Sequence, residues 1–112
     1  MSDKKISSWD KIIVTPCYVE NGKTVKLTDQ SLPVAKEELK NDADVIFDRA
    51  DCKFRYSFMF TRYEDDKMVL RSFDRSGTNQ LFIKLGETIE TPKVHISENG
   101  NEKDVYFELQ LV

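Results

Sequence analysis

The sequence has few of the residues on which metal centres, disulfide frameworks and membrane spans depend. It holds two cysteines and one histidine, so a four-ligand zinc site cannot be assembled within the chain. Cys17 and Cys52 stand in a chain that begins with a charged segment instead of an apolar leader, so we expect free thiols. No run of about 18 apolar residues is present. We therefore expect a cytoplasmic protein without a membrane-spanning segment.

The motifs of common catalytic and nucleotide-binding sites are missing as well. There is no phosphate loop, no dinucleotide fingerprint and no Gly-x-Ser-x-Gly nucleophile turn. His95 lies between two apolar residues and neither cysteine has a catalytic motif around it, which favours a surface histidine. The one sustained carboxylate cluster comprises Asp42, Asp44, Asp48 and Asp51. Its spacing does not match a calcium-binding loop, because Ile46 stands where that loop needs a ligand. We expect a non-enzymatic protein with no cofactor and no metal ion.

Charge is distributed unevenly along the chain. The 112 residues are 39% hydrophobic and 33% charged, which is typical of one folded domain, here residues 1–112. The net charge is −3, yet residues 49–75 carry +2 and contain all five arginines. Arginine presents a rigid fork of donors that suits carboxylates, phosphates and interfaces. The middle segment is therefore where we expect a binding surface.

Residues 53–63 form the clearest strand of the sequence. Side chains on an extended backbone point alternately to opposite faces, so strict alternation of aromatic and other residues indicates a strand with one buried face. The alternating rings are those of Phe54, Tyr56, Phe58 and Phe60. This segment is the best candidate for the middle of a sheet.

A hairpin is predicted within residues 11–27. Asn21-Gly22 supplies the positive φ angles of a type I′ turn, and a two-residue turn sets Tyr18 opposite Val25. Pro16 cannot donate a ladder hydrogen bond, which predicts an edge strand or a bulge at that point. Trp9, just before the first strand, is expected to cap one end of the core.

The loop after residue 63 decides how the long strand pairs with residues 68–73. A two-residue loop at Asp65-Asp66 would mix the apolar and polar faces, whereas a loop of three or five residues sets Phe60 opposite Leu70. We therefore predict the odd loop length. On that register Arg62 joins the aromatic face, near its rim.

The remaining segments complete an all-β or β-rich α+β fold. Residues 31–40 are predicted to form a short helix, with Pro33 in its first turn, or a loop. Further strands are predicted at residues 45–47, 80–85, 93–97 and 104–112. Seven or eight short antiparallel strands with at most one short helix indicate a β-sandwich or a small barrel.

These patterns favour protein binding as the function. Arginine and aromatic residues are enriched at the centres of interfaces. Those predicted to point away from the core are Arg55, Arg71, Phe73, Phe82 and Tyr106. We interpret the chain as a small acidic protein of the inhibitor, immunity-protein or assembly-factor kind, which binds its partner through the face carrying Arg55 and Arg71.

Two alternatives remain open at this point. A closed barrel holds a small ligand when its interior is not filled, although the large inward aromatic residues argue for a filled core. Arginines interleaved with aromatics are also used to bind single-stranded nucleic acid, although a pI near 5.2 weakens that interaction. An exposed edge strand such as residues 103–112 would, in addition, allow a homodimer.

Overall fold

In a computed structural model, the described residues are 8–49, 52–75, 77–98 and 100–112. They form ten strands in two antiparallel sheets, together with one short α-helix, which confirms the predicted all-β class with more strands than the seven or eight expected. Within these ranges no helix is long and apolar enough to cross a membrane.

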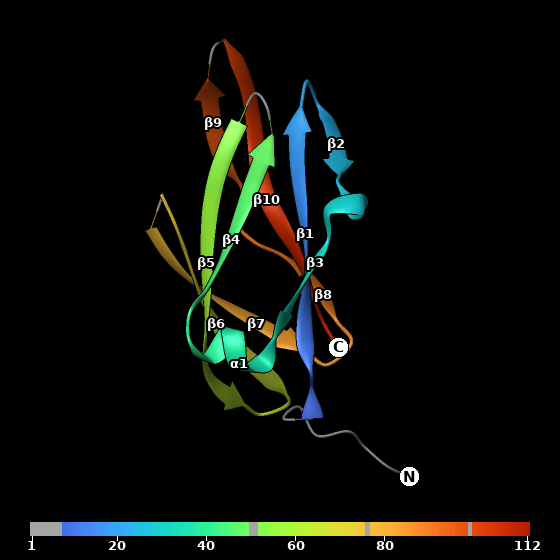
Figure 1. Cartoon of the computed structure of the whole chain (residues 1–112), viewed down its shortest axis with the longest axis vertical. Coiled ribbons are helices and arrows are strands. Elements are labelled where there is room, and N and C mark those ends of the chain that lie inside the picture. Colours follow the sequence, from blue (N-terminus) through green and yellow to red (C-terminus); the bar gives the residue numbers. More distant parts are fainter. Residues whose placement is uncertain (1–7, 50–51, 76, 99) are drawn as a thin grey trace.

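The two sheets differ in construction. The first is built on β1 (Lys11–Glu20) and β10 (Asn101–Leu111), and the second is a four-stranded meander, β4-β5-β6-β7. Figure 1 shows the green β4–β5 pair in front of the red β10 and to one side of the blue β1, with helix α1 in the lower half of the molecule. The remaining strands of the first sheet are β2 (Lys23–Lys26), β3 (Leu32–Ala35), β8 (Thr88–Glu90) and β9 (Val94–Glu98). Those of the meander are β4 (Ala43–Arg49), β5 (Cys52–Glu64), β6 (Lys67–Asp74) and β7 (Gly77–Lys84).

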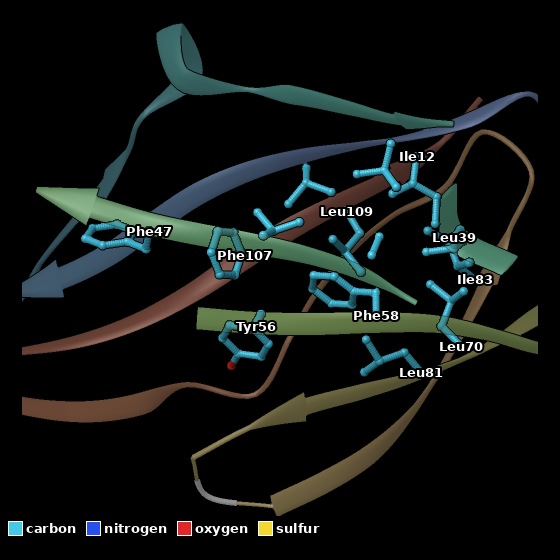
Figure 2. Close-up of a cluster of buried hydrophobic side chains, with 14 of the residues drawn as sticks. Ile12, Leu39, Phe47, Tyr56, Phe58, Leu70, Leu81, Ile83, Phe107 and Leu109 are labelled. Atoms are coloured by element: carbon cyan, nitrogen blue, oxygen red, sulfur yellow. The ribbon is translucent and has the colours of Figure 1, made fainter. Parts of the chain in front are cut away.

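The core lies between the two sheets and is rich in aromatic rings (Figure 2). Tyr56 and Phe58 on β5 meet Phe107 of β10 edge to face, with ring centroids 5.0 and 6.3 Å apart. Burying one such ring stabilises the fold by roughly 1.5–3 kcal/mol. Trp9 is buried at one end of the core, as predicted, and its Nε1–H donates to the hydroxyl of Tyr63 at 2.9 Å.

The long strand β5 lies between β4 and β6, but its turn differs from the prediction. The β5–β6 turn has two residues, Asp65 and Asp66, because Glu64 pairs with Lys67. The expected pairing of Phe60 with Leu70 is nevertheless confirmed, because the register shifts by one residue between Phe60 and Arg62. A β-bulge at this point reconciles the short turn with a buried aromatic face.

The bulge also corrects the placement of Arg62. This residue pairs with Val69 and so lies on the outer face, where we had predicted the aromatic face. It is exposed and forms an ion pair with Glu64, with 2.8 Å between Nη2 and the carboxylate oxygen.

Pro16 lies in a strand that is paired on both sides, contrary to the predicted edge or bulge. β10 pairs with one side of β1, while β3 pairs with residues 11–14 and β2 with residues 17–20 on the other. The carbonyl of Pro16 accepts a hydrogen bond from the N–H of Leu27 at 2.9 Å, so the nitrogen of Pro16 also faces the side of β1 on which β2 and β3 lie. On that side Pro16 falls in the gap between the residues paired with β3 and those paired with β2. The missing N–H therefore interrupts no ladder.

Helix α1 is shorter and begins later than predicted, because Pro33 belongs to strand β3 opposite Ile13. The helix spans only Lys36–Lys40, with Leu39 as its buried residue. Asp42 follows in the left-handed region at φ 69°, which ends the helical turn.

Candidate functional site

Four of the five residues predicted to bind a partner share the outer face of the four-stranded sheet. Arg55 lies on β5, Arg71 and Phe73 on β6, and Phe82 on β7. In an antiparallel sheet, directly opposed residues point to the same face. The opposed pairs Ile46–Arg55, Ser57–Phe73, Met59–Arg71 and Val69–Phe82 therefore build one continuous outer face across all four strands, which we call the β4–β7 outer face.

The two arginines at the centre of this face have no carboxylate partner in the described part of the chain. Among the described residues, neither Arg55 nor Arg71 forms an ion pair with a carboxylate, whereas Arg62 is paired with Glu64. Arg55 is exposed and Arg71 is half-buried. Their guanidinium groups thus retain donors with which to bind an external acceptor.

Apolar side chains accompany the arginines. Ile46 on the edge strand β4 is 48% exposed and Phe82 on the opposite edge strand β7 is 42% exposed, while Met59 and Phe73 between them are half-buried. Sequence reasoning missed Ile46, because in Val45-Ile46-Phe47 it reads as one residue of a buried run. Alternation with Val45 and Phe47 predicts only that Ile46 points away from the core, and the pairing of β4 with β5 is what sets it opposite Arg55.

Two hollows of about 360 Å³ each flank Arg55 at the end of this face where β6 stops. Both are lined by Phe54, Arg55 and Arg75. The first is completed by Ile46 and Lys53, and the second by Ser57, Phe73 and Asp74. Arg75 was also missed as a site residue, because it lies in the turn after β6 and no strand pattern places it.

The floor beneath the hollows is made of packed aromatic rings. The guanidinium carbon of Arg75 lies 5.1 Å from the centre of the Phe54 ring, and that ring packs against Tyr56 at 5.1 Å. The buried hydroxyl of Tyr56 donates to the carbonyl of Pro92, and burial together with nearby Asp74 raises the pKa of Tyr56 to about 12. An uncharged, anchored tyrosine thus supports the aromatic ring on which Arg75 rests.

Tyr106, the fifth predicted residue, is separated from the other four. It lies on β10, on the outer face of the other sheet, opposite Cys17 of β1. Both side chains are buried, at 2% and 0% exposed. Lys93 reaches over the Tyr106 ring at 4.8 Å, and the ion pair Lys26–Glu108 at 2.7 Å lies beside Cys17.

This second outer face is closed by charged side chains, and its buried groups are hard to ionise. Burial raises the pKa of the Cys17 thiol, which donates to the carbonyl of Thr15 at 3.5 Å. Burial likewise raises the pKa of Tyr106 to about 12. Cys17 is a free thiol, whereas the side chain of Cys52 lies outside the described part of the chain. Around Cys17 and Tyr106, the described residues of this face therefore offer neither an accessible nucleophile nor an open binding surface.

Other titratable clusters are arranged as surface ion pairs and turns. His95 points outward, with Nδ1 2.8 Å from Asp104 and Nε2 3.3 Å from Glu102, and these two carboxylates raise its pKa. Because each ring nitrogen faces a different carboxylate, the three groups do not converge on one point. An acidic hollow of about 450 Å³ beside helix α1 includes Asp42 and Asp44 of the predicted carboxylate cluster. In the ranges that the structure describes, no three His, Cys, Asp or Glu side chains are arranged to hold a metal ion.

Comparisons of the chain with protein-family models, with curated proteins and with solved structures found no match. The arrangement of side chains on the β4–β7 outer face is therefore the basis for a functional proposal.

Proposed function

We propose that this chain is a non-enzymatic binding protein that docks a protein partner on the β4–β7 outer face. The observation that carries the proposal is the pair Arg55 and Arg71, which have no carboxylate partner among the described residues and are flanked by exposed Ile46 and Phe82. Arginine and large apolar residues together are typical of interface centres. Binding through these arginines breaks no ion pair among the residues that the structure describes.

The core supports this proposal over a small ligand held between the sheets. The rings of Tyr56, Phe58 and Phe107 contact one another in that space (Figure 2). An acidic group on the same outer face supports a protein over a nucleic acid. Asp44, which accepts a hydrogen bond from Ser57, would repel a phosphate backbone there.

The double variant Arg55→Glu with Arg71→Glu tests the proposal. Tagged wild-type and variant protein are incubated with nuclease-treated lysate of the natural source, and the captured complexes are weighed by native mass spectrometry. The matched control is Lys11→Glu with Lys23→Glu, which makes the same change in net charge at exposed positions of the other sheet. Circular dichroism verifies that all three proteins are folded.

We expect one heteromeric complex to form with the wild type and the control and to disappear with the Arg55/Arg71 variant. Reversing a charge opposite a complementary group costs several kcal/mol, or roughly 100-fold or more in affinity. A complex that survives in the Arg55/Arg71 variant would contradict the assignment of this face.

A further inference from the structure

We infer that the two hollows beside Arg55 hold carboxylate side chains from an acidic segment of the protein partner, with large apolar residues adjoining them. This inference rests on the proposed function, since it names the chemistry of the partner at the same face. It is carried by the geometry around three cations that converge there, Lys53, Arg55 and Arg75.

The two arginines are presented in a way that suits carboxylates. The guanidinium carbon of Arg75 lies over the Phe54 ring, 5.1 Å from its centre, and this cation–π contact holds the cation at the wall of both hollows. Arg55 lines both hollows and forms no ion pair within the described chain. A planar fork with free donors binds a carboxylate through two parallel hydrogen bonds, which is stronger than a contact between neutral groups.

The walls of the hollows define what accompanies the carboxylate. Ile46 forms part of the first hollow and Phe73 part of the second, so each hollow joins a cationic wall to an apolar one. Asp74 also lines the second hollow, where its one carboxylate stands against the two arginines. A partner segment that places Asp or Glu next to Leu or Phe satisfies both walls at once. The rest of the domain carries a net negative charge, so an acidic segment is drawn to this end of the sheet and repelled elsewhere.

The test uses two labelled peptides and the intact protein. One blocked decapeptide alternates Glu and Asp with Leu and Phe, and its counterpart has Gln and Asn in place of every acid. Binding is measured by fluorescence anisotropy to the wild type, to Arg55→Gln with Arg75→Gln, and to the control Lys11→Gln with Lys23→Gln. Amide shifts in a ¹⁵N-labelled sample show where the peptide binds and whether the variants stay folded.

We expect the wild type and the control to prefer the acidic peptide by about tenfold or more, because hydrogen bonds to an ionised carboxylate are stronger than those to a neutral amide. The Arg55/Arg75 variant should lose that preference, and the largest amide shifts should fall at residues 53–57 and 73–75. Arg75→Lys keeps the charge but loses the fork, so it should retain only part of the preference.

Equal binding of the two peptides, or an unchanged preference in the Arg55/Arg75 variant, would overturn the inference. So would tighter binding of a twelve-nucleotide oligothymidine through the same arginines, which would assign the hollows to phosphates. These outcomes are distinguishable from failure of the proposed function. In the lysate experiment, a partner whose capture depends on Arg55 and Arg71 upholds docking on this face even if acidic peptides do not bind.

Discussion

Deletion of Thr61 should leave both sheets folded. The register of β5 against β6 shifts between Phe60 and Arg62, so Thr61 is the extra residue of the bulge. When it is removed, Phe60 remains opposite Leu70 and Arg62 remains opposite Val69, now as consecutive pairs of a regular ladder. Every aromatic side chain of β5 then keeps its face.

The main loss on deletion is one hydrogen bond. Thr61 Oγ1 donates to the carbonyl of Val69 at 2.6 Å, and a hydrogen bond of this kind contributes about 1 kcal/mol net. The matched control deletes Glu108 from β10, whose register with β1 is unbroken. That deletion turns the fully buried Leu109 and Leu111 toward solvent, at about 1.5–3 kcal/mol each, or roughly 3–6 kcal/mol together.

Urea unfolding followed by the fluorescence of Trp9, the one tryptophan, measures both effects. We expect the free energy of unfolding to fall by about 1 kcal/mol without Thr61 and by several kcal/mol without Glu108. A comparable loss from the two deletions would refute the reasoning, because it would mean that the bulge itself is needed for the twist of the meander.

Three further predictions concern titration and reactivity. The pKa values of Tyr56 and Tyr106 are raised to about 12, so both should stay protonated in an ultraviolet titration until the pH approaches 12. The stability that these two protonated tyrosines contribute should be lost as the pH rises from about 10 to about 12. NMR should give His95 a pKa above its ordinary 6.5, and Asp104→Asn should lower it; the associated stability is present below pH 6.5 and lost as the pH rises through the folded-state pKa. With the other cysteine replaced by serine, Cys17 should react with a thiol reagent such as DTNB only after unfolding; rapid reaction of the native protein would contradict its burial.

Local patterns in the sequence were sufficient for much of the fold. The alternation of rings from Phe54 to Phe58 predicts which face of β5 is buried, and Asn21-Gly22 predicts the pairing of Tyr18 with Val25. Both features depend on neighbouring residues, since side-chain period and turn type are local properties of the backbone.

The candidate site was predicted less completely, because it depends on which elements lie side by side. Arg55 and Arg71 were placed on one face by the register of a single hairpin. Ile46 joins them only through the pairing of β4, and Arg75 only through its stacking on Phe54. No pattern within either segment carries that information.

The sequence by itself determined the class of fold, the buried face of the central strand and the segment in which the arginines gather, because each follows from alternation, turn chemistry or composition. Tertiary structure decided the rest. Pro16 is accommodated in a strand that is paired on both sides, because it falls in the gap between the residues that pair with β3 and those that pair with β2. Tyr106 points away from the core, yet it is buried because side chains from other segments, such as Lys93 just before β9, cover it. Burial depends on what the rest of the chain brings into contact with a residue, and no local period encodes those contacts.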